Sequence, residues 1–340
     1  MKIQTLKAEN AEEDRATQYH ALIGQAQAIP VNSPSPVISV SPVILPAPHR
    51  LVDLQMRVSA PREGENLPLI LLSHGHGYSN NLSSLNGYSP LTNFWAAHGF
   101  IVIQPTHLSS KTLNFSPSTP GAPLFWRSRV EDMKLILDRL DEIEATLPEI
   151  RGRLDKSSIA VAGHSMGGHT ASMLLGARLI EPDSGEQINL IEPRIKAGVL
   201  LAAPGSGGSD LNPLAAQNYP FFLYPSFAEM ITPTLVVAGD QDIASHLTVR
   251  DADWFADPYK LSRGSKSLLT IHGGKHLLGG VSGYDAAETS DENPERVALI
   301  QRMSWAYLMS TLHPEEDEAW QTATAVLADR ASHLGRVDSK

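Results

Sequence analysis

Short apolar runs alternate along this chain with longer segments that have helical periodicity. The apolar runs cover residues 68–73, 100–104, 158–163, 197–202, 233–239 and 267–272. Continuous apolar runs of this length are typical of strands that are buried on both faces. Helix-like segments accompany them at 88–98, 126–147, 166–177, 294–311 and 315–331. The alternation predicts an α/β fold with a mainly parallel sheet of about eight strands and helices on both faces.

The two ends of the chain differ from this pattern. Residues 28–49 are rich in proline, which excludes a helix and a central strand and favours an extended edge segment that leads into a strand near 51–58. We therefore expect an N-terminal extension over 1–35, one α/β domain over 36–312 and a helical C-terminal tail over 313–340. A long loop over 204–231 is a candidate lid or substrate loop.

Composition excludes several functions. The formal net charge is −10 and no basic stripe is visible, so we expect no nucleic-acid partner. The chain has no cysteine, which excludes disulfides, thiolate metal sites and a cysteine nucleophile. No apolar run is long enough to cross a bilayer, so we expect no stable membrane insertion. Residues 1–18 are polar and do not resemble a signal peptide, which favours a cytoplasmic location.

A candidate nucleophile follows the apolar run at 158–163. Residues 163–168 read Gly-His-Ser-Met-Gly-Gly, a Gly-x-Ser-x-Gly elbow with Ser165 at its centre and a helix-like segment directly after it. The small residues two before and two after the serine allow the sharp turn that exposes its hydroxyl at a helix N-terminus. The motif alone is weak evidence for a nucleophile, because Gly-x-Ser-x-Gly also occurs by chance. A predicted strand directly before it and a predicted helix directly after it make a chance match less plausible.

A serine nucleophile needs a base that is oriented by an acid, and this elbow predicts the chain order Ser, Asp or Glu, His. Gly239-Asp240-Gln241-Asp242 follows one strand and His272-Gly273-Gly274-Lys275-His276 follows the next. We prefer His276 to His272, because two glycines give its loop the reach to return to Ser165. Between the acids Asp242 is preferred to Asp240, although the residues alone leave both open.

The oxyanion of an acyl-transfer intermediate needs backbone N–H donors. We expect one from Met166, directly after the nucleophile, and one from His76 in the glycine-containing turn 73–78. The alternative is that this turn is only structural. His74 and His76 could in principle bind a metal ion, but no carboxylate or third histidine lies near them in sequence, and we expect no metal site.

These motifs resemble the α/β-hydrolase superfamily, and within it the chlorophyllase, cutinase-type polyesterase and platelet-activating-factor acetylhydrolase-like esterases. The resemblance rests on His74-Gly75, the elbow at 163–168, Gly-x-x-Asp at 239–242 and His276. It implies an α/β-hydrolase fold, no metal or organic cofactor, and an acid at the fourth position of Gly-x-x-Asp, which favours Asp242. The longer gap before the acid, the proline-rich start and the charged C-terminal helix depart from compact cutinase-like members.

Aromatic residues in and beside the long loops suggest where a substrate binds. Trp126, Phe221, Phe222 and Trp254 are candidates for an apolar wall, and the alternative is that they pack against the body of the protein. The sequence thus predicts a serine hydrolase that cleaves an apolar acyl or aromatic carboxylic ester, a small-molecule substrate, through an acyl-enzyme on Ser165. Lactone, thioester or amide hydrolysis on the same triad, and a non-catalytic ligand-binding protein, remain alternatives.

Overall fold

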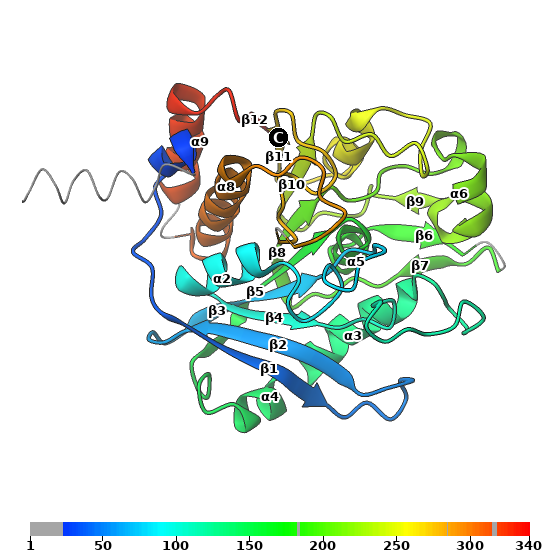
Figure 1. Cartoon of the computed structure of the whole chain (residues 1–340), viewed down its shortest axis with the longest axis horizontal. Helices are drawn as coiled ribbons and strands as arrows, with labels where there is room; N and C mark the ends of the chain where they lie inside the picture. The colour runs from blue at the N-terminus through cyan, green and yellow to red at the C-terminus, as the bar shows by residue number, and fades with distance from the viewer. Residues whose placement is uncertain (1–22, 182–183, 284, 315–317) are drawn as a thin grey trace, which may run out of the picture.

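A nine-stranded sheet runs through the centre of the protein (Figure 1). The computed structural model describes residues 23–181, 184–283, 285–314 and 318–340. The strands lie in the order β1-β2-β4-β3-β5-β8-β10-β11-β12. They are β1 (Val37–Leu45), β2 (Leu54–Pro61), β3 (Leu67–Ser73), β4 (Ile101–Pro105), β5 (Leu154–His164), β8 (Ile195–Leu201), β10 (Thr234–Gly239), β11 (Lys266–Ile271) and β12 (Gly335–Ser339).

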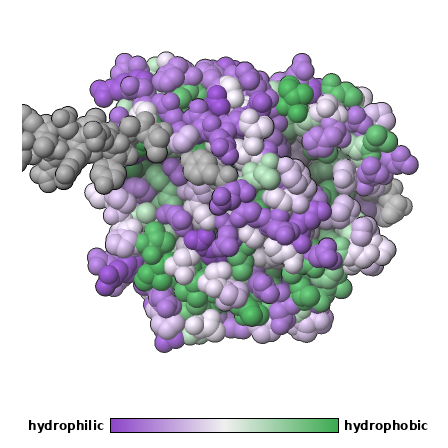
Figure 2. Space-filling view, viewed as in Figure 1, coloured by the Kyte–Doolittle hydropathy of each residue, from purple (hydrophilic) through white to green (hydrophobic). Residues whose placement is uncertain are grey.

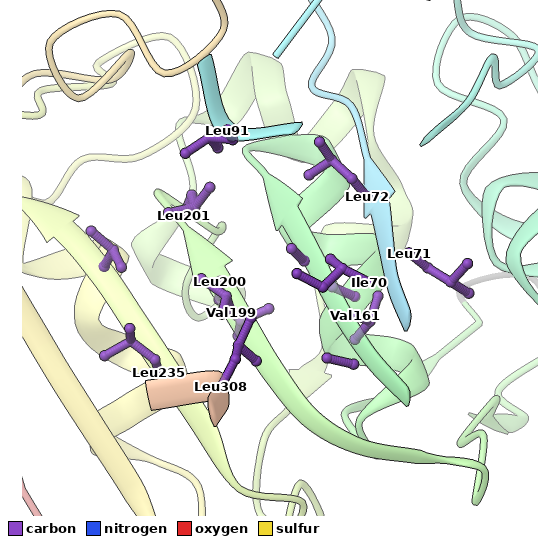
Figure 3. Packing of buried hydrophobic residues seen from close by; sticks show 14 of the residues in the cluster. Ile70, Leu71, Leu72, Leu91, Val161, Val199, Leu200, Leu201, Leu235 and Leu308 are labelled. Atoms are coloured by element: carbon purple, nitrogen blue, oxygen red, sulfur yellow. The ribbon is translucent and has the colours of Figure 1, made fainter. Parts of the chain in front are cut away.

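The middle of the sheet is parallel and its edges are antiparallel. Strands β4, β3, β5, β8, β10 and β11 pair in parallel, whereas β1, β2 and β12 add antiparallel pairs at the two edges. Every residue of β3, β10 and β11 is buried, as their continuous apolar runs predict. Figure 3 shows leucine, isoleucine and valine side chains of β3, β5, β8 and β10 packed together. The predicted α/β class with a mainly parallel sheet is confirmed.

Helices cover both faces of this sheet. Helices α2 (Ser89–Ala97) and α8 (Pro294–Leu312) pack together on one face, and α9 (Glu318–Arg330) lies against α8. On the other face α3 (Trp126–Asp138) contacts α5 (Met166–Leu174). The remaining helices are short: η1 (Gly24–Ala28), α4 (Leu140–Thr146), η2 (Gly208–Asp210), α6 (Pro213–Asn218), η3 (Pro220–Phe222), η4 (Ala252–Ala256) and α7 (Asp257–Lys260).

The helix expected over 126–147 is divided in two. Arg139 separates α3 from α4 with φ −120° and ψ 25°, outside the helical region. Its guanidinium donates to the Glu142 carboxylate and to the carbonyl of Pro46, so the residue at the break contacts the hairpin between β1 and β2. The apolar periodicity continues through the break, which explains why the sequence pattern reads as one helix.

The ends of the chain take part in the sheet. Of the N-terminal extension expected over 1–35, residues 1–22 lie outside the described residues, and β1 begins at Val37 as an edge strand. The C-terminal tail expected to be helical over 313–340 contains α9, but it then forms β12, which pairs antiparallel with β11 from Gly335 to Ser339. Strand β11 would otherwise leave its outer N–H and C=O groups unpaired.

The long segment 204–231 is not bare loop. It contains η2, α6, η3 and the short strand β9 (Pro225–Ser226). Strand β9 pairs with β6 (Arg178–Ile180), which pairs with β7 (Gln187–Asn189), so that a second, three-stranded sheet supports the segment. Figure 2 shows that on one face of the molecule hydrophilic residues are interspersed with small hydrophobic groups, as the negative net charge and modest apolar content suggest.

Candidate active site

Ser165 stands at a strained turn between β5 and α5. Its backbone has φ 53° and ψ −119°, an uncommon conformation for a residue with a side chain. The turn requires glycine on both sides: a Cβ on Gly163 would lie 2.0 Å from the Gly167 carbonyl oxygen, and one on Gly167 would lie 1.9 Å from the Ser73 carbonyl oxygen. The tight approach of these backbones is what exposes the Ser165 hydroxyl at the carboxyl edge of the sheet.

Three residues that are distant in sequence meet at this edge. Ser165 Oγ lies 2.9 Å from His276 Nε2, and His276 Nδ1 lies 2.9 Å from Asp242 Oδ2. The Asp242 carboxyl is 1% exposed, whereas the His276 side chain is 31% exposed. An ionised carboxylate only accepts hydrogen bonds, so Nδ1 of His276 carries the ring proton and Nε2 accepts the proton of the serine hydroxyl.

The alternative acid and base lie elsewhere. Asp240 Oδ1 accepts a hydrogen bond from the N–H of Gly273 at 2.7 Å, and thus ties the loop after β10 to the loop after β11. His272 Nδ1 faces the carbonyl of His333 at 3.3 Å, beside the C-terminal segment. The structure therefore brings Ser165, Asp242 and His276 together and leaves Asp240 and His272 outside this group.

Three side chains fix the backbone of the loop after β3. The carbonyl of His74 accepts from Arg129 Nη2, and the N–H of Gly75 donates to Tyr88 Oη at 2.9 Å. The carbonyl of Gly75 accepts from His74 Nδ1 at 2.7 Å. Because a trans peptide is planar with its N–H opposite its C=O, fixing the Gly75 carbonyl also fixes the N–H of His76. Within the described part of the chain, that N–H has no hydrogen-bond acceptor.

A second donor lies at the start of α5. Met166 is the first residue of this helix, and the first N–H groups of a helix have no acceptor within it. The helix N-terminus also favours negative charge, through the partial charge of its free N–H groups. The N–H groups of His76 and Met166 are therefore both available to an oxygen atom, as the sequence predicts for a pair of oxyanion donors.

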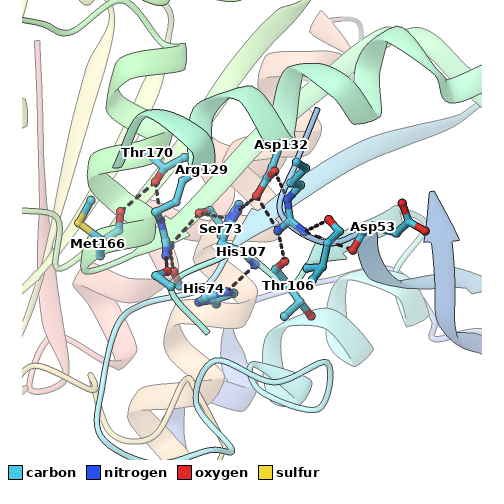
Figure 4. A network of polar contacts seen from close by, with 12 residues as sticks. Asp53, Ser73, His74, Thr106, His107, Arg129, Asp132, Met166 and Thr170 are labelled. Atoms are coloured by element: carbon cyan, nitrogen blue, oxygen red, sulfur yellow. Dashed lines mark hydrogen bonds and ion pairs between the residues drawn. The ribbon is translucent and has the colours of Figure 1, made fainter. Parts of the chain in front are cut away.

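A buried polar network supports this loop from behind (Figure 4). Arg129 is fully buried, and besides the His74 carbonyl it donates to Thr170 Oγ1 at 3.0 Å on the helix that Met166 begins. Asp132 lies one turn further along α3 and accepts from His107 Nδ1 at 2.8 Å and from Arg50 Nε at 2.8 Å. The network thus connects the loop after β3, helices α3 and α5, and the hairpin between β1 and β2.

Burial controls the charges of this network. Burial, together with the nearby charge of Arg129, holds the pKa of His74 and His107 well below the usual value for histidine, so both rings stay neutral. Burial also lowers the pKa of Arg129 to about 9 and raises the pKa of Asp132 to about 6, although Arg50 opposes the latter shift. A neutral His74 with its proton on Nδ1 matches its two hydrogen bonds, because Nε2 accepts the N–H of His107 at 3.1 Å.

Sequence reasoning did not single out Arg129, Asp132, Tyr88 or His164. One signal was present for the first two: Arg129, Asp132, Met133 and Ile136 recur at helical spacing, so both charged residues occupy the buried face of α3. Charged residues on a buried helix face are rare unless they are paired. Tyr88 and His164 gave no such signal, since aromatic rings beside a strand or helix are usually core residues.

The predicted substrate residues fall into two groups. Trp126 stacks on Phe221 with ring centroids 5.8 Å apart, and Phe221 lies against Phe222 at 4.3 Å. Both phenylalanines meet the edge of His169, one turn after Ser165 on α5. These aromatic residues thus border the nucleophile helix. The second group is Trp254, which the structure separates from the first.

Trp254 supports the 204–231 segment. It is 1% exposed, and its Nε1 donates to the carbonyl of Ser206 at 2.8 Å. Its ring packs against Phe255, whose other neighbour is the ring of His276 at 5.4 Å. Trp254 is therefore buried behind the loop, and its role in substrate binding stays a prediction.

A cavity of about 840 Å³ lies on the other side of Trp126. Its lining comes from α3, from the loop that precedes α3 and from the hairpin between β1 and β2, and it combines apolar residues such as Leu51, Leu108 and Phe125 with charged residues of α3 such as Glu131 and Lys134. Neither Ser165, Asp242 nor His276 lines it. Trp126 therefore stands between this cavity and the aromatic residues beside α5.

Comparison with known proteins gives a family match for the first part of the chain. The sequence model of the chlorophyllase family matches residues 37–180. This region runs from β1 to β6 and includes the loop after β3 and the elbow with Ser165, but it ends before Asp242 and His276. A search of curated proteins finds no significant match. Within the described residues, no helix is long and apolar enough to span a membrane.

Sheet topology, elbow geometry and family match point to one superfamily. A mainly parallel sheet with helices on both faces, a strained serine between β5 and α5, and a chlorophyllase match over residues 37–180 agree with the resemblance inferred from the motifs. The match also points to an ester as the type of bond that is hydrolysed. The chain thus has the fold of an α/β-hydrolase, and over residues 37–180 it is similar to the chlorophyllase family of that superfamily.

Proposed function

We propose that this protein hydrolyses carboxylic esters through an acyl-enzyme on Ser165, with His276 as general base and Asp242 as the acid that orients it. The observation that carries the proposal is the continuous hydrogen-bonded series from Ser165 Oγ to His276 to Asp242, with 2.9 Å at each step. Nucleophile and base within hydrogen-bond reach, with the base oriented by a third group, is the signature of an activated serine.

The reaction proceeds in two halves. Ser165 Oγ attacks the ester carbonyl carbon while His276 Nε2 accepts the hydroxyl proton, and the carbonyl oxygen becomes an oxyanion. The N–H groups of His76 and Met166 stabilise that oxyanion. The C–O bond to the alcohol breaks, and the alcohol leaves with the proton from His276. Water then attacks the acyl-enzyme with His276 again as base, and the carboxylic acid is released.

The neighbouring aromatic residues support an apolar ester. Phe221 and Phe222 are 8% and 5% exposed and lie against α5, so an acyl or aromatic group beside Ser165 would meet hydrocarbon. Apolar walls with a few placed polar groups are typical of small-molecule sites. We therefore propose that the preferred substrates have an apolar acyl chain or an aromatic group, and that Trp126 extends this wall.

The test uses purified full-length protein, p-nitrophenyl esters of graded acyl length and a fluorophosphonate probe. We expect hydrolysis and labelling at Ser165, and a loss of kcat of roughly 10³–10⁶-fold in Ser165→Ala. Ser172→Ala is the matched control, because this serine lies on the same helix and, among the described residues, its hydroxyl bonds only the carbonyl of Gly168. An unlabelled Ser165, or a Ser165→Ala variant as active as the wild type, would contradict the proposal.

A further inference from the structure

Tyr88 is held in an unfavourable backbone conformation at the start of α2. It has φ 60° and ψ 18°, the left-handed region that residues with a side chain seldom adopt, although Gly87 stands directly beside it. The residue is fully buried, and its N–H donates to the carbonyl of Ser282 at 2.8 Å. Strained positions of this kind persist where surrounding contacts determine them, and they concentrate at functional sites.

The hydroxyl of Tyr88 connects two parts of the proposed site. Its oxygen accepts the N–H of Gly75 at 2.9 Å, in the loop that presents the N–H of His76. The same oxygen lies 2.8 Å from Nδ1 of His164, the residue directly before Ser165. Nε2 of His164 in turn lies 2.7 Å from the carbonyl oxygen of His276. The Tyr88 hydroxyl and the His164 imidazole therefore connect three parts of the site: the loop after β3 (the oxyanion loop), the nucleophile elbow and the loop of His276.

Only one arrangement of protons satisfies all these contacts while His164 is neutral. The carbonyl of His276 can only accept, so Nε2 of His164 carries the ring proton and Nδ1 accepts. The Tyr88 hydroxyl therefore donates to Nδ1, and its oxygen is left to accept from Gly75. Each donor and each acceptor in the series is used, and the direction of every hydrogen bond is fixed.

The series also keeps its arrangement when the proposed base is protonated. The rings of His164 and His276 are 5.1 Å apart. Burial, and secondarily the charge of His276, lower the pKa of His164 to about 3. His164 thus stays neutral while His276 carries the proton of Ser165, and it adds no second positive charge beside the reacting groups.

We propose that Tyr88 is a positioning residue for the hydrolytic reaction: through its hydroxyl and His164 it fixes the oxyanion loop relative to the loop of His276. This inference rests on the proposed function, since it assigns Tyr88 to the same reaction. A phenylalanine would fill the same volume, but it would leave the N–H of Gly75 and Nδ1 of His164 without these partners. The loop that presents the N–H of His76 would then have lost the hydrogen bond from Gly75 to Tyr88, which is one of the contacts that hold it in place.

The experiment compares the wild type with Tyr88→Phe in two measurements. One is kcat and KM on a short p-nitrophenyl ester, and the other is the affinity for an aryl boronic acid, which forms a tetrahedral adduct on a serine nucleophile. We expect kcat to fall by roughly 10²-fold with KM nearly unchanged, because a displaced oxyanion donor matters only in the transition state. The boronic acid should bind more weakly by a similar factor.

Tyr307→Phe is the matched control. Tyr307 is also a buried tyrosine, 4% exposed, but it packs against Trp320 in helix α9. It lines a pocket with Pro233 and Lys266 at the start of β10 and β11, the opposite end of these strands from the loops of Asp242 and His276. We expect wild-type kcat and boronic acid affinity from this variant. His164→Gln tests the other end of the series and serves if Tyr88→Phe does not fold. If both residues act in one series, the double variant should lose little more activity than either single variant.

Two results would overturn the inference. One is a folded Tyr88→Phe or His164→Gln protein that retains wild-type kcat and boronic acid affinity, and the other is a loss confined to KM. The proposed function fails separately, through a Ser165→Ala protein that hydrolyses the ester as the wild type does. Activity that depends on Ser165 but not on Tyr88 would leave the proposed function intact and remove only the positioning role.

Discussion

Two aspartates that stand two residues apart have different environments. Asp242 is buried and faces His276, whereas Asp240 is exposed and caps the N–H of Gly273. Oδ1 of Asp242 has no hydrogen-bond partner in the described part of the chain, so the imidazole is the side chain's main contact. Residues two apart in an extended chain share a face, so the difference arises from the turn at 240–241, which changes the direction of the chain between the two side chains.

This difference gives a prediction for the pair. Asp242→Asn should lower kcat by roughly 10³–10⁴-fold, since an amide can donate to Nδ1 and so favours the tautomer of His276 that cannot accept the serine proton. Asp240→Asn, the matched control, should retain kcat and change the free energy of unfolding by less than about 1 kcal/mol. Steady-state kinetics on a p-nitrophenyl ester decide between them, and equal losses in both variants would refute the assignment.

The sequence could identify individual groups but not all their neighbours. Ser165 and His276 follow from a motif and from their positions after strands, and the choice of Asp242 over Asp240 came from a family resemblance. Arg129 could be placed on a buried helix face by its spacing. Its acceptors, however, lie in the loop after β3 and on α5, at Thr170 and the His74 carbonyl. Such contacts depend on how elements pack, which periodicity does not encode.

At the scale of elements, the 204–231 segment is fastened to the loop that follows Asp242. Arg250 contacts Asp210 of the segment at 3.0 Å, and it also contacts Asp257 at 2.7 Å. Asp257 in turn accepts the N–H of Ser206 at 3.0 Å. Leu211 forms a β-bridge with Thr248. The 204–231 segment is therefore held in place by contacts with the loop that follows Asp242.

Removing Arg250 should loosen this attachment. In Arg250→Met the buried carboxyl of Asp257 loses its cation, which we expect to cost about 1–3 kcal/mol of unfolding free energy. Limited proteolysis should become faster within 204–231, and KM for long-chain esters should rise more than KM for an acetate ester. Arg194→Met is the control, because Arg194 makes comparable ion pairs with Glu192 and Asp138. Equal proteolysis rates in the two variants would contradict the fastening role.

The elements that the sequence predicts best are those buried on two faces. Strands β3 and β10 are largely apolar, and β11 has Leu268, Leu269 and Ile271 at its centre and end. All three were placed within a residue or two. Strand β12 reads Gly-Arg-Val-Asp-Ser and has a single large apolar residue, Val337, so nothing in its pattern indicates a strand. An edge strand is stabilised by hydrogen bonds to its neighbour rather than by burial. The break at Arg139 was missed for a similar reason, since it depends on a contact with Pro46.

At the scale of the whole molecule, buried histidines link stability to pH. Burial is the main cause that lowers the pKa of seven histidines: to about 4 for His76, to about 3 for His164 and His169, well below the usual value for His74 and His107, and below it for His98 and His246. The unfolded chain binds these protons near pH 6.5, whereas the folded protein excludes them until lower pH. The contribution of these histidines to the free energy of unfolding is therefore fully present above pH 6.5 and is lost as the pH falls.

We thus expect the free energy of unfolding to fall steadily between pH 6.5 and about 4. Each proton bound only by the unfolded chain adds about 1.4 kcal/mol per pH unit to the slope. Asp132 acts in the opposite direction, because its pKa is raised to about 6 and its carboxyl is protonated in the folded state first. One such carboxyl cannot offset the seven histidines. Urea unfolding at several pH values measures the slope, and a flat or rising stability on acidification would contradict it.

The position of the 204–231 segment in the chain would allow substrate preference and the hydrolytic reaction to evolve separately. It leaves the sheet after β8 and returns to it at β10, whereas Ser165 follows β5 and His276 follows β11. An exchange of this segment by recombination or insertion would alter Phe221 and Phe222 of the proposed substrate wall together, and both strands that lead to the nucleophile and the base would remain as they are. Substrate preference could then change during evolution while the hydrolytic activity is kept. The bridge from Leu211 to Thr248, beside the loop of Asp242, is the place where such an exchange would have to be accommodated.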